Sequence, residues 1–320
     1  MTATDDRPTA PPRPRRDLFG RKKRLDDLAD SGVSLTADAW RRLRRNPVFL
    51  LGGGIIALFV LVAIFADVLA PQNPSVTMLA GQVVRARNEI PPAQPGHPLG
   101  GDQFGYDLAS RLIVGSRQTL LVGVLATLIG LTGGVTLGTL AGAIGGVVDT
   151  VVMRVVDVLL SIPSLLLAVS ITALFAKGSL YTVIVAVAVV QIPVFARLLR
   201  GSLLAQRDSD HVLAARSLGI RPLPIVFRHM LPNAISPVIV QSTLVLATSI
   251  IDAAALSFLG VGNPDRSRPE WGQMLGEAQN FIDSHPSLAF YPATCIIVVA
   301  LGFTLVGESL REALDPRNRR

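Results

Sequence analysis

Long runs of hydrophobic residues, separated by shorter polar stretches, dominate this chain of 320 residues. A helix that crosses the ~30 Å hydrocarbon layer of a bilayer needs about 20 mostly apolar residues. Six stretches meet or approach that length, so we predict an all-α membrane protein with six transmembrane helices. The expected spans are residues 48–70, 119–146, 151–176, 180–199, 233–260 and 289–310.

Polar stretches divide the rest of the chain. The N-terminal segment is rich in Pro, Arg and Asp, so we expect a disordered basic tail over residues 1–34. Trp40 and a run of arginines precede Pro47, which predicts an interfacial amphipathic helix over residues 35–47. The remaining expected segments are the loops 71–117, 200–232 and 261–288 and the tail 311–320, with residues 118–310 forming the core domain.

The composition agrees with a membrane protein, and the placement of charge predicts its orientation. Hydrophobic residues make up 50% of the chain, charged residues 17%, and the net charge is +7. Of the 30 Lys and Arg residues, 23 fall in the termini and in alternate loops, which include residues 200–232. An excess of Lys and Arg marks the cytoplasmic side. We therefore expect both termini in the cytoplasm, basic residues on anionic lipid, and no nucleic acid partner.

Ionisable residues within the spans are few, and each costs roughly 2.5–3.5 kcal/mol at mid-bilayer. Arg154 and Asp157 are spaced i, i+3 in the third span, so we expect them to pair on one helix face. Pro163 follows and should kink that helix. These residues form either a structural ion pair with a packing kink or a gate-forming element. Asp252, in the fifth span, either pairs within the bundle or contacts a solute.

Small residues form a ridge in the second span. Gly130, Gly134, Gly138 and Gly142 are spaced four residues apart, so they lie along one side of a helix. In lipid, such a ridge lets two helix backbones approach closely. The sequence therefore predicts that this side of the helix faces the bundle interior.

Signatures of catalysis and of cofactor binding are missing. The sequence holds no phosphate-binding loop of the G-x-x-x-x-G-K-[ST] type and no arrangement typical of a catalytic triad. His97, Asp102 and Asp107 lack the spacing that places metal ligands on one face. The single cysteine, Cys295, excludes a disulfide framework. We therefore expect no catalysis, no metal and no cofactor in this chain.

The polar stretch from Asp208 to Asn233 carries a spaced pattern between two expected spans. It reads Leu-Ala-Ala from Leu213, three residues, Gly219, nine residues, then His-Met-Leu-Pro from His229. This stretch resembles the EAA loop of ATP-binding cassette (ABC) importer permeases, whose pattern is Glu-Ala-Ala, three residues, Gly, nine residues and Ile-x-Leu-Pro. The spacing agrees throughout. Leu213 and His229 depart from the pattern, at its glutamate and its isoleucine.

The whole chain, roughly residues 36–319, resembles the dipeptide/oligopeptide (and nickel) permease family, and in particular the C-type subunit of its heterodimer. Four motifs in order, besides the loop, carry this resemblance. They are HPLGGDQFGYDLASRLIVGSRQTLLVG from His97, GTLAGAIGGVVDTVVMRVVDVLLSIPSLLLA from Gly138, LSFLGVGNPDRSRPEWGQML from Leu256 and GESLREALDPRNR near the C-terminus.

The resemblance implies the type I ABC importer permease fold and a multi-pass location in the bacterial inner (plasma) membrane. Its implied partners are a homologous second permease subunit, two ATPase subunits that bind ATP and Mg, and an extracytoplasmic solute-binding protein. Peptide is the implied solute, and nickel or another small solute is the alternative. Two other classes stay open: a secondary transporter driven by an ion gradient, which would carry inverted repeats, and a non-transporting scaffold.

The resemblance also implies that the loop folds as two short helices, the first of which lies in a cleft on the ATPase subunit. The candidate coupling residues are Asp210, Leu213, Ala214, Ala215, Arg216, Gly219, Arg228 and Pro232. We expect Asp210 to cap the first helix, Gly219 to end it in the left-handed conformation, and Pro232 to start the fifth span.

The alanine pair, Ala214 and Ala215, has no bulk, so a partner surface can close over both side chains. Arg216 and Arg228 would supply charge-assisted contacts to that partner. Leu213 is expected to make an apolar contact where the family has a glutamate. The alternative is a basic amphipathic loop that lies on anionic lipid.

Overall fold

A computed structural model describes residues 40–84, 89–175 and 177–314 as a bundle of helices. The longer helices are α3 (Pro47–Ile64), α5 (Leu108–Ile144), α6 (Gly146–Ser161), α8 (Leu180–Gln206), α12 (Ser236–Phe258) and α14 (Ser287–Leu314). The shorter ones are α4 (Ala66–Leu69), η2 (Ala80–Gln82), α7 (Ser164–Thr172), α9 (Asp210–Ser217), α10 (Pro222–Ile225), η4 (Val226–Met230), α11 (Leu231–Ala234), α13 (Trp271–Glu277) and η5 (Gln279–Phe281). Among these residues, β-pairing is limited to isolated bridges in the 84–107 segment.

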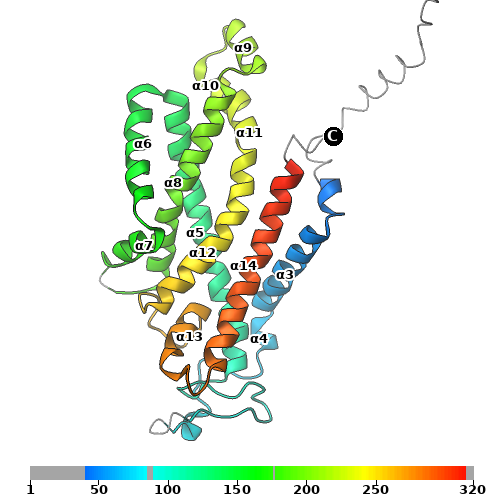
Figure 1. The fold of residues 1–320 in the computed structure, drawn as a ribbon, viewed down its shortest axis with the longest axis vertical. Coiled ribbons are helices and arrows are strands. Elements are labelled where there is room, and N and C mark those ends of the chain that lie inside the picture. The colour runs from blue at the N-terminus through cyan, green and yellow to red at the C-terminus, as the bar shows by residue number, and fades with distance from the viewer. Residues whose placement is uncertain (1–39, 85–88, 176, 315–320) are drawn as a thin grey trace, which may run out of the picture.

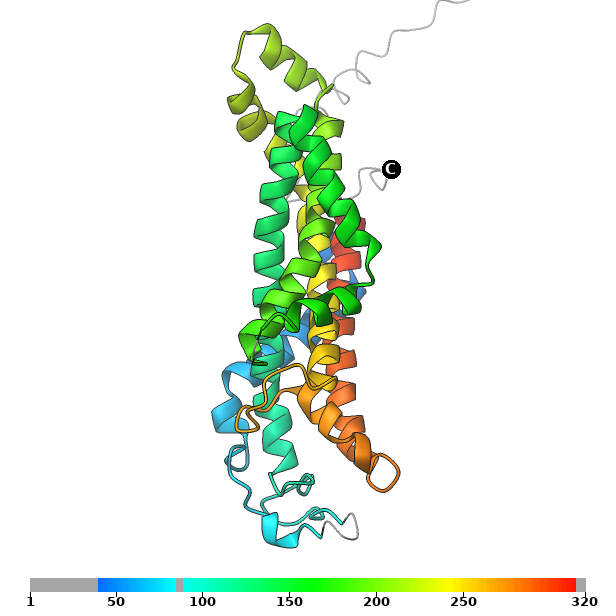
Figure 2. The ribbon, with the colours of Figure 1, turned by 90° about the vertical axis from the view of Figure 1, so that its left-hand side faces the viewer.

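Five of the helices are long and apolar enough to cross a membrane, namely α3, α5, α8, α12 and α14. The pair α6 and α7 supplies a sixth candidate span. Figures 1 and 2 place α9 at one end of the long axis and α13 near the other, and we call these the α9 end and the α13 end. The start of α3 and the end of α14 lie towards the α9 end (Figure 1).

The glycine ridge of α5 packs against α8, as the sequence predicts. A Cβ on Gly138 would lie 2.7 Å from the carbonyl oxygen of Ala196, and one on Gly130 would lie 2.9 Å from the Cβ of Gln191. Both distances are too short for a real side chain, so only glycine lets the two backbones come this close. This contact fixes α8 against α5 along much of the bundle.

The third expected span, residues 151–176, is not one continuous helix. The helices α6 and α7 are bent by 98° at Ile162 and Pro163. Proline disfavours the helical conformation of the residue before it, and Ile162 is extended with φ −92° and ψ 131°. Figure 1 shows α6 running along the bundle and α7 turned across it. The expected kink at Pro163 is therefore a full break, which begins a new helix.

Other helix bounds also differ from the hydropathy pattern. The helix α5 begins at Leu108, well before residue 119, because the side chain of Asp107 accepts a hydrogen bond from the Ser110 amide and caps it. The helix α8 continues past residue 199 to Gln206, into the expected polar loop. Polar residues at helix ends lower the hydropathy without ending the helix, so the pattern marks only the apolar part.

The N-terminal segment is described from Trp40 onward. Residues 40–43 are helical, Trp40 packs edge-on against Phe49, and the guanidinium of Arg44 lies 4.9 Å from the centre of the Trp40 ring. Asn46 then caps α3 by accepting hydrogen bonds from the amides of Val48 and Phe49. The tail 1–34, residues 35–39 of the expected 35–47 helix and residues 315–320 lie outside the described residues. Residues 44–46 are not helical and Pro47 already belongs to α3, so the expected helix ends four residues early, at Leu43.

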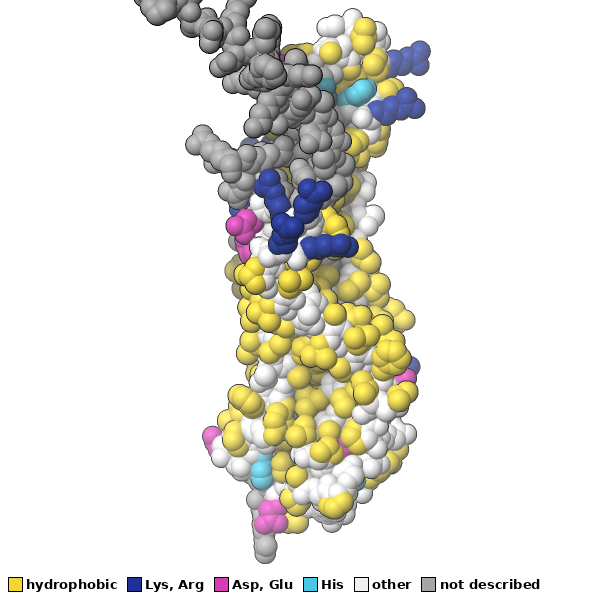
Figure 3. Space-filling view, turned by 90° about the vertical axis from the view of Figure 1, so that its right-hand side faces the viewer, with side chains coloured by type: hydrophobic (Ala, Val, Ile, Leu, Met, Phe, Trp, Pro, Cys, Tyr) yellow, Lys and Arg dark blue, Asp and Glu magenta, His cyan; other side chains and the backbone are white. Residues whose placement is uncertain are grey.

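The surface agrees with a protein that lies in a bilayer. Figure 3 shows one face, on which hydrophobic side chains cover the middle of the molecule and Lys and Arg gather towards the α9 end. On α3, Leu51, Leu58 and Ile64 are more than half exposed. An apolar band of this kind needs a hydrocarbon environment.

Candidate functional site

The helix α9 carries the first half of the spaced loop. Ser209 is the N-cap residue, with φ −72° and ψ 147°, and Asp210 is the first helical residue. The expected cap at Asp210 is therefore wrong by one position. Its carboxylate instead lies in the first turn, where negative charge favours the positive end of the helix dipole.

The end of α9 is a Schellman motif. Gly219 has φ +75°, its amide bonds to the carbonyl of Arg216, and the amide of Ile220 bonds to the carbonyl of Ala215. Glycine adopts this left-handed conformation without a Cβ penalty. The space around Gly219 is open, so the backbone conformation, and no packing contact, requires glycine here.

The two alanines of the spaced pattern face opposite ways. Val212 and Ala215 are buried on a cluster that includes Phe195, Leu199 and Leu203 of α8. Ala214 and Leu213 are exposed, Leu213 by 44%. The small side chain of Ala215 therefore serves packing within this chain, whereas Ala214 and Leu213 are open to a partner.

The second half of the loop is irregular in a way that the sequence did not predict. Residues Val226–Met230 form a π-helical turn, in which the amide of Leu231 bonds five residues back to Val226. Pro232 has no N–H, so the regular ladder cannot continue through it. Pro232 lies in α11, and the fifth span, α12, begins only at Ser236, so the expected role of Pro232 is corrected. Arg216 and Arg228 are both exposed.

Two ion pairs join α6 to α8 near this loop. The carboxylate of Asp157 accepts a hydrogen bond from Arg197 of α8, so the expected pairing with Arg154 is wrong. Arg200 binds Asp149 through two hydrogen bonds of 2.8 and 2.7 Å. Arg154 is exposed. An arginine on a packed neighbouring helix reaches the carboxylate with better geometry than one on the same helix, and spacing along one helix cannot reveal that.

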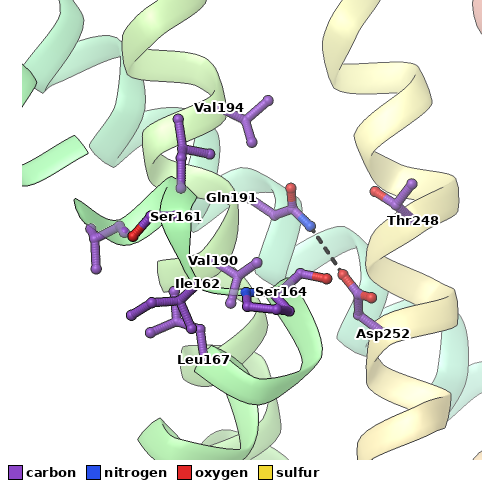
Figure 4. Close-up of a pocket in the computed structure, with 12 residues that line it drawn as sticks. Ser161, Ile162, Ser164, Leu167, Val190, Gln191, Val194, Thr248 and Asp252 are labelled. Carbon is purple, nitrogen blue, oxygen red and sulfur yellow. Dashed lines mark hydrogen bonds between the residues drawn. The ribbon is translucent and has the colours of Figure 1, made fainter. Parts of the chain in front are cut away.

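A pocket of 580 Å³ lies where α6 breaks into α7, against α8 and α12. Figure 4 shows Asp252 on α12 projecting towards Gln191 on α8. The Nε2 atom of Gln191 donates a 3.4 Å hydrogen bond to Oδ2 of Asp252. Ser161, Ser164 and Thr248 add hydroxyl groups to an otherwise apolar lining. The break at Pro163 thus helps to form a partly open pocket that carries one carboxylate, one amide and three hydroxyl groups beside apolar side chains.

A second pocket of 720 Å³ continues from the first towards the α9 end. The two share Leu160 and Val194, and the second adds Arg197 of α8 and Gln241 of α12. On α12, Gln241, Thr248 and Asp252 lie seven and four residues apart, which places them on one helix face. The sequence drew attention to Asp252 but not to Thr248 or Gln241, which this helical spacing from Asp252 could have identified.

The α13 end holds a charge cluster around the buried Arg111, which we call the Arg111 cluster: Arg111, Asp102, Glu277 and the half-exposed Arg266. Arg111 is fully buried, 3.4 Å from Asp102 and 3.6 Å from Glu277, and it donates to the carbonyl of Arg266 at 3.0 Å. Burial raises the pKa of Asp102, although Arg111 beside it acts in the opposite direction. Burial likewise raises the pKa of Glu277, against the lowering effect of Arg266.

Glu270 is a further buried carboxyl group at the α13 end. Its two oxygens accept hydrogen bonds of 3.0 Å from the hydroxyl of Ser257. Burial raises the pKa of Glu270 to about 7. The next residue, Trp271, is buried, donates through Nε1 to the carbonyl of Leu112 at 2.9 Å, and packs edge-on against Phe59. These contacts join α13 to α3, α5 and α12.

Comparison with known families identifies the chain. A family model described as the binding-protein-dependent transport system inner membrane component matches residues 134–320, more than half of the chain. The chain belongs to this family. A second model, the N-terminal transmembrane domain of oligopeptide transport permease C, matches residues 34–92. The N-terminal span and the core are thus both accounted for by transport permeases.

Similar proteins are permease subunits. The dipeptide transport system permease protein DppC of Alkalihalophilus pseudofirmus is 38% identical over 90% of this chain and 91% of its own length. The glutathione transport system permease protein GsiD of Salmonella typhimurium is 43% identical over 87% and 89%. An inward-facing structure of the MetNI methionine ABC transporter matches with a TM-score of 0.53 and 21% identity, covering 64% of this chain and 96% of that one.

These similarities establish the protein class, the fold and the membrane location of this chain. The chain is a multi-pass inner membrane protein with the ABC importer permease fold, and it is a permease subunit of the ABC importer class. Membership of this family does not favour the alternative of an ion-gradient-driven transporter.

Proposed function

We propose that this permease passes small peptides delivered by an extracytoplasmic binding protein, with ATP hydrolysed on separate ATPase subunits. The relatives are named for dipeptide and for glutathione transport, and both solutes are small peptides. The observation that carries the coupling to an ATPase is the geometry of α9. Its own bundle buries Val212 and Ala215, while Leu213 and Ala214 stand free on the opposite side.

The α9 end is the cytoplasmic end in this proposal. Lys and Arg gather there, and their excess favours the cytoplasmic side. The ATPase then meets an apolar surface made of Leu213, Leu218, Leu223 and Phe227, each at least 44% exposed. The leucine at the family's glutamate position fits this surface, because it extends the apolar contact.

The binding protein docks at the α13 end, over residues 71–117 and 261–287. A homologous second permease subunit completes the path for the solute, and two ATPase subunits hold ATP and Mg. In the mechanism, closure of the ATPases on ATP pushes α9 and reorients the spans around the two pockets. Each state must bind the partners differently, because ATP can shift only an equilibrium whose two states differ in affinity.

The direct test is uptake by the complete importer in proteoliposomes. We expect a labelled dipeptide or tripeptide to enter when ATP and the binding protein are present, and uptake to stop when ATP is depleted. An uncoupler should have no direct effect. Uptake that follows an ion gradient instead would contradict ATP coupling, and uptake of nickel or another small solute in place of peptide would contradict the cargo.

A further inference from the structure

Asp252 is the single ionisable residue that lines the 580 Å³ pocket. It projects from α12 into the space between α7 and α8 (Figure 4). A charged side chain within a membrane span is costly unless it is paired or faces a water-filled cavity. A carboxylate at this depth therefore calls for a partner that offsets its charge.

Within the chain, few groups stabilise a negative charge on Asp252. Gln191 donates one hydrogen bond of 3.4 Å, beyond the usual range for an N–H···O bond, and its amide carries no charge. An ionised carboxylate can accept about four hydrogen bonds. In the part of the chain that the structure describes, Arg197 of the adjoining 720 Å³ pocket is bound to Asp157, and no ion pair joins Asp252 to a cation.

We propose that Asp252 binds the α-ammonium group of the peptide in transit, an inference that rests on the peptide cargo proposed above. An α-amino group has a pKa of about 7.7–8.0, so it is mostly protonated near neutral pH and brings three donors. Charge-assisted hydrogen bonds to a carboxylate are roughly twice as strong as neutral ones. The hydroxyls of Ser164 and Thr248 lie in the same lining and can bond to the peptide backbone.

The size and chemistry of the pocket fit this ligand better than a metal ion. Its 580 Å³ lies within the roughly 300–1,000 Å³ that is usual for small-molecule sites. A divalent cation prefers several oxygen ligands with more than one carboxylate. The lining supplies one carboxylate, one amide and three hydroxyls beside apolar side chains, which suits a singly charged organic cation.

The test compares two peptides in proteoliposomes that hold the complete importer. One is labelled trialanine, and the other is the same peptide with its amino group replaced by hydrogen, each at a concentration that saturates the binding protein. Wild-type importer should prefer the peptide with the free amino group. Asp252→Asn should lower uptake of trialanine at least about tenfold and remove the preference, since the variant loses a charge-assisted hydrogen bond to the ammonium group. Asp252→Glu should keep the preference.

The preference is a ratio within each variant, so the amount of assembled complex cancels. Glu308→Gln, which neutralises an exposed carboxylate at the end of α14, is the matched control and should keep the preference. An unchanged preference in Asp252→Asn would overturn the assignment and leave peptide transport standing. Failure of the wild type to move either peptide would overturn the proposed function and the assignment together.

A second measurement needs no variant. A hydrophobic carbodiimide reacts with membrane-buried carboxyl groups, and mass spectrometry reports the extent of labelling at Asp252 in the wild type. Trialanine should slow labelling of Asp252 in the turning-over importer, while the desamino peptide should not. Equal labelling in the presence of both peptides would contradict an ammonium site at Asp252.

Discussion

The α13 end and the α9 end of the molecule differ in which groups they bury and which they expose. At the α13 end, charged groups are buried and bound to one another, with Arg111 enclosed by Asp102, Glu277 and the carbonyl of Arg266. At the α9 end, apolar groups outside the spans are exposed, with Leu218 at 80% and Leu223 at 67%. The first end pairs its charges within its own chain, whereas the second has an apolar surface that we propose the ATPase covers. Stability and coupling are therefore expected to respond to different mutations.

The largest effect is expected at the Arg111 cluster. Arg111→Met would leave Asp102 buried without its cation and Glu277 with Arg266 alone, and breaking a buried pair in this way costs about 3–5 kcal/mol. Thermal unfolding of the purified importer should show a lower Tm and a smaller yield of intact complex. Arg216→Met is the control, because Arg216 is exposed at the α9 end, where a surface substitution usually changes the free energy of unfolding by no more than about 0.5 kcal/mol. Equal losses in both variants would remove the distinction between the ends.

A pH dependence should follow from Glu270 at the same end. Because burial raises its pKa from 4.5 to about 7, the folded chain holds a proton that the unfolded chain releases in this range. The free energy of unfolding should therefore fall as pH rises from 4.5 to 7, by roughly 3 kcal/mol at 1.36 kcal/mol per pKa unit. Glu270→Gln should flatten most of this slope in Tm measured from pH 5 to 8. Glu308→Gln should keep the slope, and loss of it there would show that another group titrates.

A smaller effect should separate the two alanines of α9. Ala215→Leu overfills a position that is only 4% exposed, which costs about 1–3 kcal/mol. Ala214→Leu adds the same atoms to an exposed position and should change the free energy of unfolding by no more than about 0.5 kcal/mol. Denaturant or thermal unfolding of both variants checks this. If the two variants lose stability alike, the packing of α9 described above is incorrect.

The sequence predicted what depends on local pattern. Apolar length located the membrane helices, and the four-residue spacing from Gly130 to Gly142 predicted the close packing that α5 makes with α8. The left-handed turn at Gly219 was also expected, because few residues other than glycine end a helix in that way. Each of these features follows from neighbours in sequence.

Features that depend on distant contacts could not be predicted. Asp157 binds Arg197 from another helix, and Arg111 gains its partners only when α13 folds back onto α5. Pro163 marked a bend, but the 98° angle depends on how α7 packs against α8 and α12. The spaced motif likewise gave no way to tell Ala214 from Ala215. Which of the two is buried depends on the packing of Val212 against the bundle, and that contact joins residues far apart in the sequence.

The central claim, that the outer face of α9 couples this permease to an ATPase, is tested most directly by Ala214→Arg. The assay measures ATP-driven peptide uptake and ATP hydrolysis by the complete importer in proteoliposomes, with Ala214→Ser as the control. We predict that Ala214→Arg assembles and unfolds at the wild-type temperature but loses most uptake, because the charged side chain blocks the surface beside Leu213. Normal uptake in Ala214→Arg would contradict the claim.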